Sequence, residues 1–276
     1  MNIVLYPSGG LGNRMRAIDS AVNLNSRLGR SVKNKLSVIW YRDSEMKCDW
    51  KDVFKPVDFI KDKSMSKLLR FVLNHKNDNK IVAIALSVLK RLRMVCVLDI
   101  FDGSIDYLPT IKDGCRCHTL IVRSCITFCP SELFHNELFE IKDRERLNRE
   151  LSKVDANTIG IHIRRTDNSL AVQHSPLELF VKMMKTEMEA DPDVHFYLCS
   201  DDEKVKNVFR ADIWREHCRM PEESLDRDTI EGVVQAACEM QALAACKKIY
   251  GSYWSSFGGV AARMGRIENI IVSDVE

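Results

Sequence analysis

The chain has 276 residues, of which 45% are hydrophobic and 29% are charged. This length suffices for one large domain or two smaller domains with separate cores, and the composition is ordinary for a globular protein. The formal net charge is only +2. It argues against a nucleic-acid-binding protein, which normally carries a basic domain or stripe.

The first residues do not have the pattern of a signal peptide. Met1 leads directly into the apolar run Asn2–Tyr6, without a basic region or a long apolar core. The longest apolar stretch, Ile81–Leu89, contains Ser87 and is much shorter than the ~20 residues of a membrane-spanning helix. We therefore expect a cytoplasmic protein, with the inner face of a membrane as the alternative location.

Ten cysteines are scattered along the chain, and a reducing compartment would keep them as thiols. The densest group consists of Cys115, Cys117, His118, Cys125 and Cys129. Its spacing matches no standard zinc pattern, and the segment around Ile121 is predicted to be a strand. Packed thiols are the prediction and a metal site is the alternative.

Short apolar runs alternate with helical patterns, which is typical of an α/β fold with a largely parallel sheet. In the first half, strands are predicted at Ile3–Tyr6, Ser37–Trp40, Val95–Ile100 and Thr119–Val122. In the second half, they are predicted at Thr158–Arg164, Val194–Cys199, Lys248–Gly251 and Asn269–Val272. The charged stretch Glu140–Lys153 indicates a helix and a linker, so we place a domain boundary near residue 155.

The segment Ile81–Met94 predicts an amphipathic helix with a basic end at Lys90, Arg91 and Arg93. We expect its apolar side to pack on the core, as in most helices with this pattern. A helix that docks on a membrane surface or on an acceptor is the alternative.

A glycine-rich loop, Ser8–Arg14, follows the predicted strand Ile3–Tyr6 and precedes a helical pattern. Glycines let a backbone approach a ligand, and a helix N-terminus offers unpaired N–H groups to an anion. A dinucleotide site would need glycine in place of Met15 and an acidic residue about 20 positions further on. Residues 30–36 supply no acid. The loop therefore predicts a phosphate site without NAD, or else a purely structural turn.

A pair of arginines ends the predicted strand Thr158–Arg164, in which three isoleucines face one side while His162 and Arg164 face the other. Ligands bind at this end of parallel strands, and adjacent arginines near a core need an anionic partner such as phosphate. We expect Arg164 to contact a diphosphate and Arg165, on the opposite face, to hold the loop and Asp167. A salt bridge at the strand end is the alternative.

A third strand-to-helix corner spans Ile249–Gly258. Apolar residues at helical spacing follow it, so Ser255 or Ser256 is the predicted N-cap. Hydroxyl and amide groups at the start of such a helix form a second anion-binding site. A capped helix that binds no ligand is the alternative.

Metal-dependent transferases use an Asp-x-Asp pair after a strand. The two pairs here are Asp191 with Asp193, in a turn before a strand, and Asp226 with Asp228, in a polar loop. Neither pair ends a strand, so we expect no metal. Asp201 does follow a predicted strand, and it is a candidate to bind a ribose hydroxyl or simply to start a solvated loop.

These three loops resemble the superfamily of α1,2-, α1,6- and protein O-fucosyltransferases, which includes rhizobial chitooligosaccharide α1,6-fucosyltransferases. The family pattern H-x-R-R-x-D is matched by His162, Arg164, Arg165 and Asp167. The glycine-rich opening is similar to Gly9–Arg14, and the Ser/Trp/Phe-rich corner is similar to Gly251–Gly258. Order and spacing agree over nearly the whole chain except residues 44–115.

The resemblance implies a GT-B-like architecture of two facing Rossmann-like α/β domains with a cleft between them. Residues 1–155 would form the N-terminal domain on the acceptor side, and residues 156–276 would bind the nucleotide sugar. It also implies GDP-fucose as donor, inversion at the anomeric carbon, and no metal or other cofactor.

By the same resemblance, Arg164 binds the β-phosphate and is the catalytic residue, and His162 lies against the nucleoside. Gly10 faces the diphosphate. Glu239 binds guanine, at a position where the family has Asp. Asn168 stands where several relatives have lysine.

The segment Ser169–His174 lacks the carboxylate that the α1,6-enzymes place there, so the resemblance assigns no general base.

The sequence thus predicts a fucosyltransferase that acts on a glycan or glycoconjugate hydroxyl, with possible peripheral contact to a membrane. Two alternatives stay open. One is a transferase for another GDP- or UDP-sugar. The other is a guanine-nucleotide-binding protein without catalysis.

Overall fold

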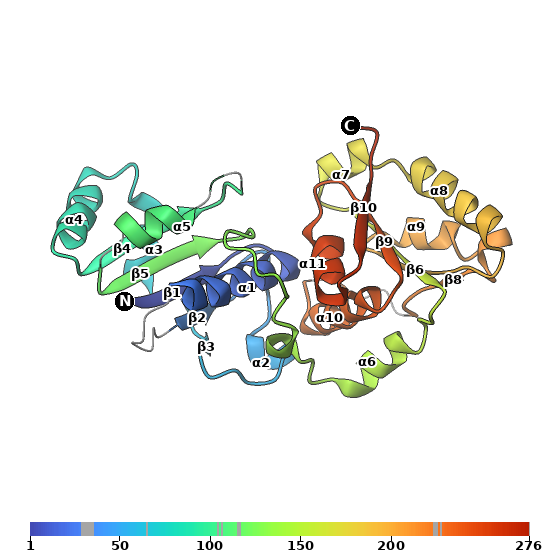
Figure 1. Ribbon diagram of the computed structural model, residues 1–276, viewed down its shortest axis with the longest axis horizontal. Helices are drawn as coiled ribbons and strands as arrows, with labels where there is room; N and C mark the ends of the chain where they lie inside the picture. Colours follow the sequence, from blue (N-terminus) through green and yellow to red (C-terminus); the bar gives the residue numbers. More distant parts are fainter. Residues whose placement is uncertain are drawn as a thin grey trace. The chain divides into compact units, whose positions relative to one another are not determined.

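The computed structural model describes residues 1–28, 36–64, 66–103, 105, 107–114, 117–222, 226 and 228–275. The chain forms two compact units. Unit 1 consists of Met1–Glu132 with Glu137–Phe139, and unit 2 consists of Leu133–Asn136 with Glu140–Glu276. Each unit contains one five-stranded sheet with helices packed around it (Figure 1). The division precedes the boundary expected near residue 155, because the segment from Glu140 onward belongs to unit 2.

The sheet of unit 1 has the strand order β3-β2-β1-β5-β4, and all its pairs are parallel. The strands are β1 (Asn2–Pro7), β2 (Leu36–Trp40), β3 (Ile60–Asp62), β4 (Val95–Ile100) and β5 (Thr119–Ser124). The helical segments are α1 (Leu11–Arg27), α2 (Trp50–Val53), α3 (Lys67–His75), α4 (Lys80–Arg91), α5 (Tyr107–Pro109) and the π-helix η1 (Thr110–Gly114).

The sheet of unit 2 has the order β10-β9-β6-β7-β8 and is also parallel. Its strands are β6 (Thr158–Ile163), β7 (His195–Ser200), β8 (Cys218–Arg219), β9 (Lys248–Ser252) and β10 (Glu268–Val272). The α-helices are α6 (Arg144–Leu151), α7 (Ser169–His174), α8 (Leu177–Ala190), α9 (Glu203–Val208), α10 (Ile230–Ala244) and α11 (Ser256–Gly265). Two 3-10 helices, η2 (Asn136–Phe139) and η3 (Asp212–Trp214), complete the described elements.

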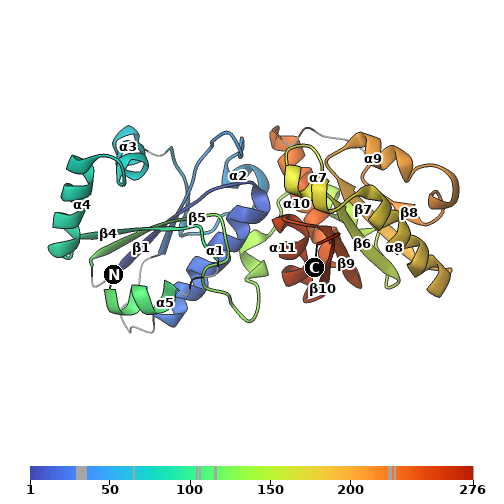
Figure 2. The same ribbon diagram turned by 90° about the horizontal axis from the view of Figure 1, so that it is seen from above.

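Strand β6 lies in the middle of its sheet and is buried along its whole length. Its three isoleucines join the apolar core that includes Phe180 and Met184 of α8. On the opposite face, a Cβ atom at Gly160 would lie 2.8 Å from the side chain of Leu243. Glycine is therefore what allows α10 to pack closely on that face, while α8 covers the other (Figure 2).

The predicted α/β fold with parallel sheets is confirmed, and each of the eight predicted strands is present within two residues of its predicted ends. Strands β3 and β8 were not predicted. They have three and two residues, which is too short to show an alternating or continuous apolar pattern.

The helix predicted at Ile81–Met94 exists as α4, but its expected apolar packing on the core is wrong. Val82 is its one buried residue, whereas Ile81, Ile84 and Val88 are exposed. The helix contacts β4, the edge strand of the sheet, and runs across the direction of that strand (Figure 2). A helix at an edge strand has less sheet surface to pack on than a helix over the centre of a sheet, so much of its apolar side stays exposed.

None of the nine described cysteines forms a disulfide, and seven of them are buried, which fits the expectation of packed thiols. Cys115 lies outside the described residues. Within the described parts of the chain, the His, Cys, Asp and Glu side chains make no group that could hold a metal ion. Among the helices that the structure describes, none is both long enough and apolar enough to cross a bilayer.

The two glycines before α1 have different structural demands. Gly9 has φ +83°, and an added Cβ would meet the Asn13 side chain at 2.6 Å. Gly10, the N-cap of α1, has φ −69°, and an added Cβ would meet nothing within 4 Å. We expect Gly9→Ala to lower the free energy of unfolding by about 1–3 kcal/mol, since it adds strain at positive φ.

The matched variant Gly10→Ala should change that free energy by less than ~0.5 kcal/mol. Urea denaturation measures both values. Equal destabilisation by the two variants would contradict this account of the loop.

Candidate functional site

Three loops meet at the carboxyl edge of the sheet in unit 2. They follow β6, β7 and β9, which are neighbours in the strand order β9-β6-β7. The loops contain Arg164–Asn168, Asp201–Asp202 and Tyr253–Ser255. Because parallel strands end at one edge, the arginine motif, Asp201 and the serine corner come together there. The glycine-rich loop Ser8–Arg14 belongs to unit 1.

Arg164 is held between two carboxylates. Its Nη1 lies 2.9 Å from Oδ2 of Asp201, and its Nη2 donates a hydrogen bond to Asp167. The backbone N–H of Arg164 donates to Oγ of Ser252 at 2.9 Å. The guanidinium is therefore oriented in advance and remains partly exposed.

The Asp201 carboxylate is occupied by the motif loop. Oδ1 accepts from the backbone N–H of Arg165 at 2.8 Å, and Oδ2 accepts from the Thr166 hydroxyl at 2.7 Å. Oδ2 also accepts from the Thr166 N–H and pairs with Arg164. These contacts make Asp201 a positioning residue for the loop, a role that neither sequence interpretation of Asp201 included.

Arg165 points to the opposite face of the strand, as predicted. Its guanidinium donates to three carbonyl oxygens, of Arg164 at 3.1 Å, Ala171 at 3.4 Å and Ser175 at 2.7 Å. It therefore holds the β6–α7 loop and α7. The expected bond from Arg165 to Asp167 is wrong, since Asp167 accepts from Arg164. A carboxylate three residues after Arg164 reaches back across the turn on that side.

His162 is buried and stacks on the ring of Phe257, with centroids 4.8 Å apart and planes at 22°. Burial and the nearby Arg164 charge lower the pKa of His162 to about 4, so the imidazole is neutral at pH 7. Its Nδ1 is buried without a hydrogen-bond partner among the described residues. Such an atom is rare in native proteins, and it can pair with a bound polar group.

Ser255 is the N-cap of α11, so one of the two predicted caps is confirmed, and Ser256 is the first helical residue. The Ser255 side chain makes no capping hydrogen bond to the described helix. Asn168 Nδ2 donates to the Trp254 carbonyl at 2.9 Å, which fixes this corner to the arginine loop. The amide groups at the start of α11 thus lie at the same sheet edge as Arg164.

Glu239 lies on α10, over the same face of the sheet as His162. Its Oε1 accepts from Gln235 Nε2 at 3.1 Å. The Cys199 thiol of β7 lies near its carboxyl group. Cys199 is the register partner of His162 in β7. Burial raises the pKa of Glu239 to about 7, so the carboxyl group is partly protonated at neutral pH.

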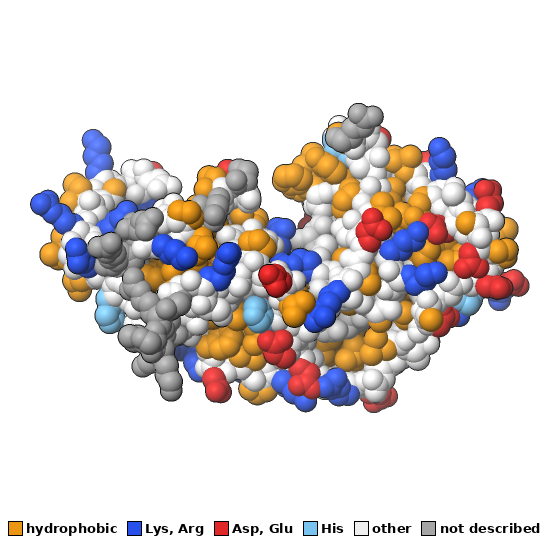
Figure 3. All heavy atoms as spheres, viewed as in Figure 1, with side chains coloured by type: hydrophobic (Ala, Val, Ile, Leu, Met, Phe, Trp, Pro, Cys, Tyr) orange, Lys and Arg blue, Asp and Glu red, His pale blue; other side chains and the backbone are white. Residues whose placement is uncertain are grey.

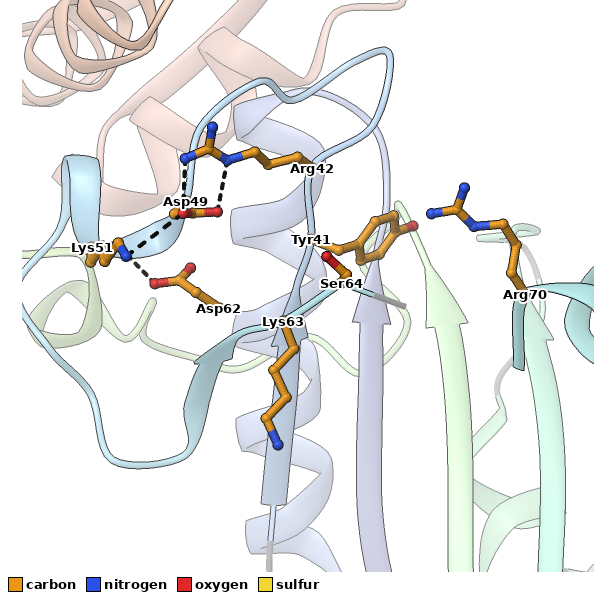
Figure 4. Close-up of a pocket in the computed structure, with 8 residues that line it drawn as sticks. All are labelled: Tyr41, Arg42, Asp49, Lys51, Asp62, Lys63, Ser64 and Arg70. Carbon is orange, nitrogen blue, oxygen red and sulfur yellow. Dashed lines mark hydrogen bonds and ion pairs between the residues drawn. The ribbon is translucent and has the colours of Figure 1, made fainter. Parts of the chain in front are cut away.

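Sequence reasoning missed a pocket of about 290 Å³ in unit 1. It lies where β2 and β3 end, and it is lined by Tyr41, Arg42, Asp49, Lys51, Asp62, Lys63, Ser64 and Arg70 (Figure 4). Arg42 makes a bidentate bond to Asp49, with both distances 2.8 Å. None of the predicted site residues lines this pocket. It falls in the stretch 44–115 and its immediate flank, where no motif was found.

Several solved fucosyltransferases share this fold. NodZ α-1,6-fucosyltransferase soaked with GDP-fucose matches with a TM-score of 0.60 and 16% identity, covering 95% of this chain and 92% of that one. A mutant of Arabidopsis thaliana FUT1 in complex with GDP matches with a TM-score of 0.61 and 13% identity, covering 98% and 69%. POFUT1 with GDP-fucose matches with a TM-score of 0.52 and 11% identity, covering 98% of each chain.

Neither a protein-family model nor a curated protein sequence matches the chain. The structural matches belong to the superfamily that the arginine motif resembles, and they confirm the predicted GT-B-like fold class. They span nearly the whole chain, so both units take part in the likeness.

The opposite pKa shifts of Glu239 and His162 predict opposite effects of pH on stability. Glu239 has a raised folded pKa, so its contribution is fully present below about pH 4.5 and is lost as pH rises to about 7. His162 has a lowered folded pKa, so its contribution grows between about pH 4 and 6.5.

We expect the unfolding free energy of wild type relative to Glu239→Gln to fall by up to about 3 kcal/mol between pH 4.5 and 7. Urea denaturation of both proteins across this range measures the difference. Taking the difference cancels the His162 contribution, which both proteins retain. A difference that does not vary with pH would show that Glu239 is not a protonated, buried carboxyl group.

Proposed function

We propose that this protein is an inverting, metal-independent glycosyltransferase that moves fucose from GDP-fucose to a hydroxyl group of a glycan or glycoconjugate. The observation that carries the proposal is Arg164, which two carboxylates orient at the carboxyl edge of the second sheet. The fold supports it, since NodZ and POFUT1 are fucosyltransferases that have been solved with GDP-fucose.

The chemistry requires a cation at this place. When the bond between fucose and the β-phosphate breaks, negative charge grows on the departing GDP. Without a metal, that charge has to be met by cations and N–H dipoles that already point at the phosphate. Arg164 is the proposed catalytic residue, and the N–H groups behind Ser255 and Ser256 are its proposed helpers.

The other donor contacts are also proposals. His162 is assigned to the nucleoside, where its buried Nδ1 offers an acceptor or donor, and Asp167 and Asp201 keep Arg164 in position. Glu239 is assigned to guanine, whose N–H groups a carboxylate can bind. Gly10 is assigned to the diphosphate, because its open Cα leaves room for a ligand.

The acceptor side is assigned to unit 1, where the pocket beside Tyr41 and Arg42 lies. The acceptor hydroxyl attacks the anomeric carbon from the face opposite to GDP, so the configuration inverts.

One observation favours a second function, which is guanine-nucleotide binding without catalysis. Asp167 is the one carboxylate in residues 164–176, and it bonds to Arg164. Residues 164–176 therefore contain no second carboxylate that could act as the general base. Slow release of fucose from GDP-fucose into water distinguishes the transferase from the binding protein. Thermal shifts with GDP, UDP and ADP distinguish the donors, since a ligand bound by the folded state raises the melting temperature.

We predict that GDP raises the melting temperature equally in EDTA and in added Mg²⁺ or Mn²⁺. The reason is that Arg164 and helix N–H groups supply the positive charge that a metal supplies elsewhere. Differential scanning fluorimetry at matched GDP concentrations measures the shift. A shift that disappears in EDTA would overturn the metal-independent mechanism while leaving GDP binding intact.

We predict that Arg164→Lys lowers turnover by ~100-fold or more, the scale of losing one preorganised charge-stabilising donor. Lysine keeps the charge but cannot reach both carboxylates with separate nitrogens. Arg165→Lys serves as the matched comparison. It loses contacts to carbonyl oxygens and should lower the unfolding free energy by about 1–3 kcal/mol, with a smaller loss of activity per folded molecule.

Initial rates of GDP-fucose turnover and urea denaturation of both variants provide the two readouts. Near wild-type turnover in Arg164→Lys would refute the proposed donor site. A catalytic loss confined to Arg165→Lys would move the phosphate contact to the other face of β6.

A further inference from the structure

We propose that helix α4 docks unit 1 on a membrane surface that contains anionic lipids. The helix exposes a row of large apolar side chains at positions 81, 84, 88 and 92, whose spacing places them on one face. Their exposed fractions are 79% for Ile81, 64% for Ile84, 50% for Val88 and 62% for Leu92. Leu68 and Phe71 of the neighbouring helix α3 are exposed as well.

Basic residues flank this apolar row at both ends. Lys80 begins the helix, and Lys90, Arg91 and Arg93 follow at its end, all of them exposed. Residues 80–94 contain no Asp or Glu. In Figure 3, the surface around α4 (left) shows apolar and basic side chains next to one another. An exposed apolar face with cationic borders is the pattern of helices that lie in a membrane interface.

The charges favour a lipid surface over a second copy of the chain. A symmetric dimer through α4 would bring each row of cations toward the cations of the other copy, with no acid on the helix to pair with them. Anionic headgroups offer the opposite charge, and acyl chains accept Ile84 and Val88. The attraction contributed by each Lys or Arg near such a surface is about 1 kcal/mol.

The position of α4 allows this contact. The helix contacts the edge strand β4 and the helix α3, and Val82 is its buried residue. The apolar row can therefore enter the headgroup region without any rearrangement of the sheet. The helix has 12 residues, which is long enough to lie in an interface and too short to span a bilayer.

The test is co-sedimentation of the full-length protein with vesicles of phosphatidylcholine alone and of equimolar phosphatidylcholine and phosphatidylglycerol. We expect binding to the mixed vesicles that weakens as salt rises, because salt screens the Lys and Arg charges. Ile84→Ser/Val88→Ser should lower partitioning about 10-fold or more. Lys90→Gln/Arg91→Gln should lower it by a similar factor.

Matched controls come from unit 2. Val208→Ser/Ile213→Ser removes two exposed apolar side chains, and Lys182→Gln/Lys185→Gln removes two exposed charges. Both controls should bind the vesicles as wild type does. All variants alter exposed positions, so circular dichroism should show unchanged folding.

Three results would overturn the proposal. In the first, wild type fails to bind the mixed vesicles. In the second, the control variants lose as much vesicle binding as the α4 variants. In the third, Ile84→Ser/Val88→Ser binds the vesicles as well as wild type does. Sedimentation velocity adds a fourth. A dimer that Ile84→Ser/Val88→Ser abolishes would assign the face to a second copy instead. GDP thermal shifts should be the same in all variants, so failure here is distinguishable from failure of the proposed transferase function.

Discussion

The candidate site depends on one carboxylate, that of Asp201 at the end of β7. Arginine charges near a sheet core are costly unless a negative group compensates them, and removing one partner of such a pair leaves the other charge unpaired. Asp201 is 14% exposed and binds Arg164 together with the backbone of the next two residues. Asp167, which is 52% exposed, is the more easily displaced partner. Under the proposed function, a diphosphate would take the place of Asp167 while Asp201 continues to hold the arginine.

Much of this arrangement follows from the order of residues along β6. Alternation in a strand places the isoleucines of β6 on one face and His162 on the other, and the structure has this division. Apolar runs likewise predicted the long strands. The partners of each side chain could not be predicted in this way. Asp201 lies 36 residues beyond Arg165, and the choice of Asp167 for Arg164 depends on how the turn bends.

Two further features, the exposure of α4 and the pKa of Glu239, could not be predicted from sequence patterns. The periodicity of residues 81–94 established that one side of the helix is apolar, but a periodic pattern contains no information on what covers that side. The structure places α4 at a sheet edge and leaves the apolar row exposed. The raised pKa of Glu239 depends on burial and, to a smaller extent, on the charge of Glu150, which comes from another element. Such a shift can be derived only once the helix is packed on the sheet.

Comparison of Arg14, in helix α1, with the two arginines that follow β6 indicates which of them a ligand can reach. Arg14 is fully buried, donates to the carbonyls of Gly9 and Tyr41 and pairs with Asp43. Its guanidinium also lies 5.0 Å from the Trp40 ring centroid, so it has a structural role. Arg165 is fixed by backbone carbonyls, which no ligand can remove. Arg164 is bound by two carboxylates, one of them exposed, and an anionic ligand can compete for this position because it supplies the same kind of charge.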